Sequence, residues 1–386
     1  MTENKTIYLD NAATTRVAPE VAAVMARMLT EEFGNPSSLH RMGLLAEKAV
    51  KKARAQVAAA LGCAPRQVVF TGSGTEADNL ALSAPFRSPE RIRGRKIILS
   101  AFEHPAVREP ALYYASLGAE VVFLPVDAAT GSVRPADLAA ALDEDTVLVS
   151  VMHVNNETGA VQPIRELAAL CAAVKNRRGE KPLFHTDMIQ SFGKLPVDLT
   201  NVDLASISAH KIAGPKGVGA LFVRKPEKLA PLIRGGGQEG GLRSGTENTA
   251  GIAALGVAAQ LAAERQEEHY NHALAYRREL AEGVRQAIPH ARIHDAAGQS
   301  PFILSVSFPG ARGEVLVHDL TTAGIYAATG SACSNIGKKA ANPVLAAAGY
   351  TEEEATGTLR LSTGYENSMS EIPHVIQHLT AAAARF

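Results

Sequence analysis

The chain has 386 residues, of which 46% are hydrophobic and 20% charged, and its 39 basic residues balance 39 acidic ones. This length exceeds that of one ordinary compact core, so we expect about two domains. A net charge of zero argues against nucleic acid as a direct partner. The polar first residues and the lack of an apolar run of about 18 residues predict neither a signal peptide nor a membrane span.

The three cysteines, Cys63, Cys171 and Cys333, are far apart in the sequence. An odd, sparse set argues against a disulfide framework and is typical of a reducing compartment. No C-x-x-C occurs, which argues against a thiolate zinc site. We therefore expect a cytoplasmic protein.

Short apolar runs rich in β-branched residues alternate with amphipathic helical patterns over the first two thirds of the chain. Such runs predict strands, and their alternation with helices predicts an α/β fold with a mostly parallel sheet flanked by helices. The predicted strands cover residues 67–71, 96–100, 120–124, 146–152, 182–186, 203–208 and 220–223.

The later part of the chain has a different pattern. One long helical tract is predicted over residues 248–287, followed by fewer strands, at 302–308 and 358–363. We expect this part to form a smaller α+β domain, linked to the first domain by the helical tract. The predicted division assigns residues 16–255 to the large domain, and residues 1–15 and 256–386 to the smaller one.

Polar residues follow several of the predicted strands directly. Because the carboxyl ends of parallel strands meet at one edge of a sheet, these residues should lie close together. Residues 72–79, "GSGTEADN", place glycines and Thr75 at a helix start, where backbone N–H groups bind phosphate well. The alternative is an ordinary helix cap that pairs Thr75 with Asp78.

Asp187 and Lys211 end two other predicted strands. Alone, Lys211 reads as a surface lysine and Asp187 as a cap or ion-pair partner. A metal site built from His104, His185, Asp187 and His210 is a third alternative, but their spacing matches no metal motif, so we expect no metal. A lysine, an aspartate and a phosphate cradle on one edge suit pyridoxal 5′-phosphate, which needs an imine partner, a ring-nitrogen partner and an anion site.

At this point the sequence resembles a known family. Motifs along nearly the whole chain are similar to cysteine desulfurases of the NifS/IscS type, which are fold-type I pyridoxal phosphate enzymes of the class V aminotransferase group. The motifs are "YLDNAATT" (8–15), "FGNPSSLH" (33–40), "FTGSGTEADN" (70–79), "EHPAV" (103–107), "MHVNNETGAVQPI" (152–164), "HTDMIQSFGKLPVD" (185–198), "SAHKIAGPKGVGALFVR" (208–224), "GGGQEGGLRSGTEN" (235–248), "GSACS" (330–334) and "LRLSTG" (359–364).

The resemblance implies roles for the residues around the cofactor ring. Lys211 corresponds to the lysine that forms the Schiff base, and His104 to the histidine that stacks on the ring and moves protons. Asp187 corresponds to the partner of the ring nitrogen. Gln190 and Asn156 resemble the groups that hold the ring oxygen and position the cofactor.

The resemblance also implies a phosphate cradle shared between two subunits. Thr246 is similar to a threonine that reaches the phosphate of the neighbouring subunit, which implies a homodimer with shared active sites. The cradle within one chain corresponds to Gly74, Thr75, Ser208 and His210.

Substrate binding and sulfur transfer follow from the resemblance as well. Arg360 corresponds to the clamp for the substrate carboxylate, assisted by Asn35, and Cys333 to the catalytic cysteine on a loop of about residues 325–345. The implied activity converts L-cysteine to L-alanine and places the sulfur on Cys333 as a persulfide. An acceptor protein, such as an iron–sulfur scaffold, then takes the sulfur.

The sequence leaves alternatives and departures from the family pattern. The alternatives are selenocysteine lyase, another class V lyase or aminotransferase, and a non-catalytic sulfur-transfer scaffold. Met188 stands where a small residue is usual, Gly240 where Arg or Asn is common, and residues 335–345, "NIGKKAANPVL", lack a common Ser-His pair. These differences concern rate, loop behaviour and acceptor choice more than the type of reaction.

Overall fold

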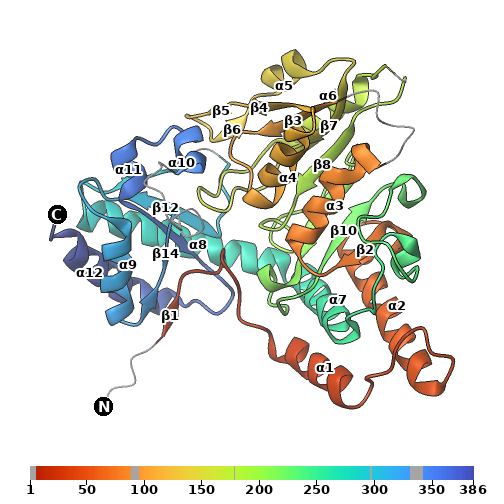
Figure 1. Cartoon of the computed structure of the whole chain (residues 1–386). Coiled ribbons are helices and arrows are strands. Elements are labelled where there is room, and N and C mark those ends of the chain that lie inside the picture. The colour runs from red at the N-terminus through yellow and green to blue at the C-terminus, as the bar shows by residue number, and fades with distance from the viewer. Residues whose placement is uncertain (1–5, 88–94, 178, 296–297, 331–341) are drawn as a thin grey trace.

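The computed structural model describes residues 6–87, 95–177, 179–295, 298–330 and 342–386. Figure 1 shows a larger body built around one sheet and a smaller body beside it. The N-terminal strand β1 (Ile7–Tyr8) lies with the smaller body, and the chain then crosses to helix α1 (Pro19–Thr30) in the larger one (Figure 1). This crossing segment, residues 9–18, lies where the two bodies meet and forms part of the site described below.

The larger body contains the sheet expected from the sequence. Seven strands lie in the order β2-β10-β9-β8-β7-β3-β4, and only β10 runs antiparallel to its neighbours. The expectation of a mostly parallel α/β sheet is therefore confirmed. The strands are β2 (Val68–Thr71), β3 (Lys96–Ser100), β4 (Glu120–Leu124), β7 (Thr146–Ser150), β8 (Leu183–Asp187), β9 (Leu204–Ser208) and β10 (Gly219–Val223).

Helices cover both faces of this sheet, which explains why its central strands are apolar on both sides. On one face Ile98 and Val149 belong to a core shared with α1, α2, α5, α6 and α7, and on the other Ile97 and Leu148 pack with α3 and α4. The helices are α2 (Arg41–Leu61), α3 (Gly74–Arg87), α4 (Pro105–Ser116), α5 (Pro135–Ala141), α6 (Ile164–Ala173) and α7 (Thr249–Glu264). A small hairpin of β5 (Val126–Asp127) and β6 (Ser132–Val133) follows β4.

The smaller body is an antiparallel sheet in the order β11-β12-β15-β14, packed against helices. Ile7 and Leu9 share its core with Tyr276, Leu316 and Val375. Strand β1 pairs with β13 of this body. The elements are α8 (Gln266–Ala287), β11 (Arg292–Ile293), β12 (Ile303–Ser307), α9 (Gly313–Thr322), β13 (Ile325–Tyr326), β14 (Ala328–Thr329), α10 (Pro343–Ala347), α11 (Glu352–Thr356), β15 (Thr358–Ser362) and α12 (Ile372–Ala383).

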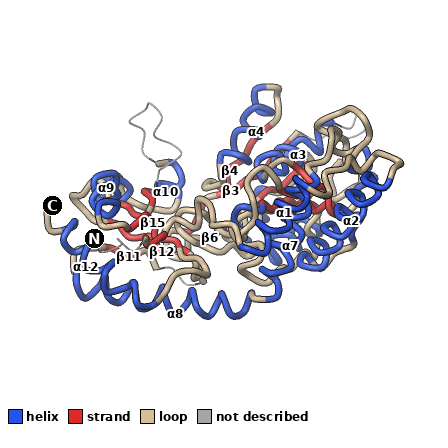
Figure 2. The backbone as a smooth tube through the Cα atoms, turned by 90° about the horizontal axis from the view of Figure 1, so that it is seen from below, coloured by secondary structure: helices blue, strands red, loops and turns tan. Residues whose placement is uncertain are grey.

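The helical tract expected over residues 248–287 is present, but it is divided into two helices. The tract forms two helices, α7 and α8, which meet at Arg265, where the backbone leaves the helical region at φ −108° and ψ 11°. The two halves meet different surroundings: α7 is buried along most of its length, whereas α8 is amphipathic and leads to the smaller body (Figure 2). The proposed domain boundary after residue 255, within α7, stays a prediction.

Candidate active site

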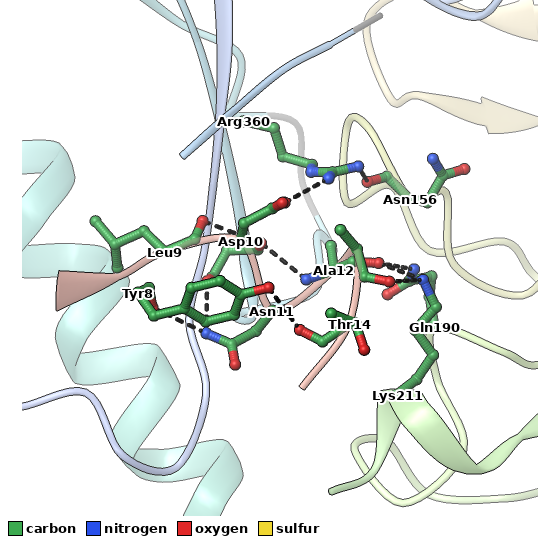
Figure 3. A network of polar contacts seen from close by, with 12 residues as sticks. Tyr8, Leu9, Asp10, Asn11, Ala12, Thr14, Asn156, Gln190, Lys211 and Arg360 are labelled. Atoms are coloured by element: carbon green, nitrogen blue, oxygen red, sulfur yellow. Dashed lines mark hydrogen bonds and ion pairs between the residues drawn. The ribbon is translucent and has the colours of Figure 1, made fainter. Parts of the chain in front are cut away.

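Lys211 lies at the carboxyl edge of the large sheet, at the end of the short helix η3 (Ala209–Lys211) that follows β9. Its Nζ donates hydrogen bonds to the carbonyl oxygens of Ala12 (2.6 Å) and Ala13 (2.8 Å). Gln190 Nε2 donates to the same Ala12 oxygen at 2.8 Å. Figure 3 shows both side chains converging on this crossing segment, so the N-terminal chain forms one wall of the site.

Asp187 ends the neighbouring strand β8 and is buried. Its Oδ1 accepts a hydrogen bond from the backbone N–H of Ile189 at 2.8 Å. Burial raises the pKa of Asp187 to about 6, although the Ile189 N–H and the Lys211 charge act in the opposite direction. A buried carboxylate is costly without a positive charge beside it, so Asp187 favours a cationic partner.

The start of helix α3 is capped by residues other than the pair Thr75 and Asp78. Ser73 Oγ accepts from the N–H of Glu76 at 3.1 Å, and Glu76 Oε2 accepts from the N–H of Gly72 at 2.8 Å. The cap that pairs Thr75 with Asp78 is therefore wrong: Thr75 is exposed, and the Asp78 side chain is fully buried.

Gly74 brings the start of α3 close to the ends of β8 and β9. A Cβ atom at this position would lie 2.3 Å from Cδ1 of Ile189 and 3.3 Å from Cβ of Ser208. Glycine therefore lets the backbone N–H groups at this helix start approach Ser208 closely without displacing the Ile189 side chain. The close approach leaves the N-terminal end of α3 beside the Lys211 edge of the sheet.

Two histidines flank Lys211, and both are neutral at pH 7. Burial and the Lys211 charge lower the pKa of His104 to about 4, and burial with the charges of Lys211, Lys216 and Lys194 does the same for His210. The Nδ1 of His104 accepts from the N–H of Ala106 at the start of α4. A neutral imidazole can pack against the face of another ring and can accept a proton.

Arg360 enters the site from strand β15 of the smaller body and is buried. Its Nη2 donates to Asp10 Oδ1 at 2.7 Å, and its Nη1 donates to the backbone oxygen of Asn156 at 3.0 Å (Figure 3). Its Nε is buried without a hydrogen-bond partner among the described residues. The guanidinium is thus fixed in place and keeps one donor for an additional acceptor.

Comparison with known proteins agrees with this geometry. The model of the class V aminotransferase family matches residues 7–375. The cysteine desulfurase IscS of Clostridium botulinum (strain Hall) is 40% identical over 97% of this chain and 94% of its own length. The cysteine desulfurase NifS of Azotobacter vinelandii is 40% identical over 98% of this chain and 93% of its own.

A solved NifS-like protein superposes with a TM-score of 0.90 at 36% identity, covering 99% of this chain and all of that one. The chain belongs to the class V aminotransferase family. The family resemblance and the fold class expected from the sequence are both confirmed.

Three residues that the resemblance assigns to the class V site are not joined to it within the described part of one chain. Asn35 lies in the α1–α2 connection, where its Oδ1 accepts from the N–H of Ser37 at 3.0 Å. Figure 2 shows α1 and α2 at the opposite end of the molecule from β15, the strand of Arg360. Thr246 is exposed and lines a cavity of about 140 Å³ beside Gly72. Cys333 lies outside the described residues.

Asn156 and Ser208 lie on the loop beside Arg360 and at the end of β9, respectively. Asn156 contacts Arg360 through its backbone oxygen, and Figure 3 shows its side-chain amide pointing away from Arg360. Ser208 is buried at the end of β9, two positions before His210, whose Nδ1 lies 3.2 Å from Thr14 Oγ1. The ligands of these side chains stay predictions.

The structure adds residues that sequence reasoning did not select. Asp10, within the "YLDN" motif, pairs with Arg360. Glu157 accepts from Asn342 Nδ2 at 2.6 Å, and the same Nδ2 also bonds the Gly330 carbonyl. Burial raises the pKa of Glu157 to about 7, opposed by the Asn342 hydrogen bond and the Arg360 charge. The only sequence signal for these residues is their place inside the family motifs.

The residues present fit pyridoxal phosphate. Asp187 lacks a cationic hydrogen-bond partner in the part of the chain that is described, and Gln190 Oε1 is buried without a partner. Gly74 exposes the helix start that suits a phosphate. No group of three or more His, Cys, Asp or Glu side chains in the described ranges could hold a metal ion. None of the helices described there has both the length and the apolar character needed to cross a bilayer.

Proposed function

We propose that this protein is a pyridoxal phosphate-dependent cysteine desulfurase that converts L-cysteine to L-alanine and receives the sulfur on Cys333 as a persulfide. The observation that carries the proposal is the meeting of Lys211, Gln190 and Arg360 from two bodies around the crossing segment. The buried Asp187 lies close enough for the Lys211 charge to act on it. The names of the relatives, which share about two fifths of their residues with this chain, support the same activity.

When bound, the cofactor supplies an electron sink for the substrate. Lys211 would hold the cofactor, and its amine, once released, would be suited to move the α-proton of the substrate. Asp187 would stabilise a positive charge on the ring nitrogen, and neutral His104 would support the ring and could accept or return a proton. Release of the two Lys211 hydrogen bonds to Ala12 and Ala13 is needed before its Nζ turns to the cofactor.

Arg360 selects an amino acid as substrate. Its guanidinium is held by Asp10 and by the Asn156 carbonyl, which keeps it rigid, and its free Nε–H supports binding of an α-carboxylate. Asn35 would assist only from another chain, because the two lie apart within one chain.

Cys333 is the proposed sulfur acceptor within the chain. Its thiolate attacks the substrate sulfur, the carbon–sulfur bond breaks, and alanine leaves after protonation. A second acceptor, such as an iron–sulfur scaffold protein, then takes the terminal sulfur. A homodimer with Thr246 facing the neighbour's phosphate site, and a cytoplasmic location, complete the proposal.

The activity is tested by following L-cysteine consumption, alanine and sulfide with the purified, cofactor-loaded protein. The Lys211→Ala variant is expected to lose the imine absorbance and turnover. Lys216→Ala is the matched control, since Lys216 lies exposed in the same loop. Turnover by Lys211→Ala at the wild-type rate would contradict the proposal. A parallel assay with L-selenocysteine separates this activity from a selenocysteine lyase.

A further inference from the structure

Asp78 is a fully buried carboxyl group that the proposed reaction does not use. It lies on α3, one turn after the Gly74–Thr75 helix start, and neither carboxyl oxygen has a hydrogen-bond partner among the residues that the structure describes. A buried carboxyl group without partners is expensive as an anion, so its presence needs an explanation.

Two polar side chains lie close to Asp78: His185, whose Nε2 lies 3.6 Å from Oδ1, and Ser206, whose hydroxyl favours the charged form of the carboxyl group. That imidazole is satisfied on both sides, because Nδ1 lies 2.8 Å from Ser150 Oγ and Nε2 lies 3.0 Å from Ser206 Oγ. Burial lowers the pKa of His185 to about 3, so the ring is neutral. Asp78 therefore does not form a charged ion pair with His185.

His185 and Asp187 lie two residues apart on β8, so both side chains point to the same face of the sheet. Helix α3 packs on the sheet and brings Asp78 against His185 on that face. Helix α3 thus carries both the expected phosphate cradle at its start and the Asp78 carboxyl group, which lies against the strand that ends in Asp187.

Few charged groups face Asp78. Asp187 on β8 and Glu103 after β3 are acidic, His185 is neutral, and no described lysine or arginine pairs with Asp78. Two close carboxylates in a dry environment do not both ionise readily. Burial and the charges of Asp187 and Glu103 raise the pKa of Asp78 well above its usual range, although the Ser206 hydroxyl acts in the opposite direction. Asp187 is drawn toward ionisation by the Ile189 N–H and by Lys211.

We propose that Asp78 is a positioning residue for Asp187: it stays a neutral carboxylic acid that packs beneath His185 and leaves the negative charge at the ring-facing edge to Asp187 alone. The proposal rests on the proposed function, because it gives Asp187 the cofactor ring as its partner. It differs from simple packing, since it requires a neutral polar group of this shape.

The first experiment measures pyridoxal phosphate binding and the absorbance spectrum of the bound cofactor. The neutral isostere Asp78→Asn is expected to keep the wild-type spectrum and a dissociation constant within about twofold. Asp78→Ala is expected to weaken binding by about tenfold or more and to shift the spectrum, as loss of a supporting residue does elsewhere.

Leu82→Ala is the matched control, because Leu82 is a fully buried α3 residue whose truncation destabilises the same helix. It should lower stability without changing the spectrum. Equal spectra for Asp78→Ala and Leu82→Ala would reduce Asp78 to a packing residue and overturn the proposal. Loss of binding in Asp78→Asn would show that a charge is required, which overturns it too.

A second experiment needs no cofactor and so separates this inference from the proposed function. In a Glu103→Gln, Glu157→Gln background, which removes two further buried carboxyl groups whose pKa burial raises to about 8 and about 7, the cofactor-free protein is examined by infrared spectroscopy at pH 7.5. We expect the band of one buried carboxylic acid, and its loss on adding Asp78→Asn. Absence of the band before that change would contradict a neutral Asp78, whatever the enzyme does with cysteine.

Discussion

Glu103 gives the fold a pH dependence that can be measured without any substrate. It lies at the start of the loop after β3 and is buried. One oxygen accepts from the N–H of Met152 at 2.7 Å and from the Ser100 hydroxyl, and the other has no partner among the described residues. Burial raises the pKa of Glu103 from 4.5 to about 8; hydrogen bonds from Ser100 and Met152 oppose this, and the Asp187 charge adds to it.

The sign follows from which state binds the proton. Between pH 4.5 and 8 the folded protein keeps the Glu103 proton and the unfolded chain has lost it, so the stability contributed by this group is complete below pH 4.5 and is lost as the pH rises to 8. At pH 7 the gap from 4.5 is about 2.5 pH units, which corresponds to about 3 kcal/mol.

The perturbation is Glu103→Gln, which replaces the protonated carboxyl group by a neutral group of the same shape. We expect the free energy of unfolding of the variant, measured with urea, to exceed that of wild type by about 3 kcal/mol at pH 7 and about 4 kcal/mol at pH 8, and to be nearly equal to it at pH 5. Glu109→Gln, at an exposed site on α4, is the control. Parallel pH profiles for wild type and Glu103→Gln would refute the reasoning.

Three further predictions concern the site. Arg360→Lys should raise KM for L-cysteine by about tenfold or more while leaving the cofactor spectrum unchanged, because lysine lacks the planar fork; an unchanged KM would exclude Arg360 as the carboxylate clamp. Gly74→Ala should weaken pyridoxal phosphate binding, since the new Cβ would lie 2.3 Å from Ile189 Cδ1. Affinity is measured by fluorescence titration, and an affinity equal to that of wild type would contradict this prediction. Cys333→Ala should keep the imine absorbance but release neither sulfide nor alanine from L-cysteine; full turnover would remove Cys333 from the mechanism.

The large sheet could be predicted because its signals are local. Each central strand is a short apolar run buried on both faces, and the covering helices carry apolar stripes that are visible within one segment. The break at Arg265 could not be predicted, because residues on both sides favour helix and only their different packing partners separate them.

The site was predictable where a residue stands at a strand end and obscure where it depends on distant contacts. Lys211 and Asp187 follow buried strands, and the sheet brings such positions to one edge. The ion pair between Arg360 and Asp10 joins residues 350 positions apart, and no periodicity reveals it. Asp78 has the spacing of a helix cap, and only tertiary packing shows that its side chain is buried.

The most direct test of sulfur transfer is mass spectrometry of the cofactor-loaded protein after addition of L-cysteine, with alkylation to protect persulfides. The other two cysteines are internal controls: burial raises the pKa of Cys63 to about 11 and that of Cys171 to about 12, so neither is a ready thiolate. We predict one added sulfur on Cys333 alone, accompanied by alanine. Alanine formation with Cys333 unmodified, or sulfur on another cysteine instead, would contradict the account.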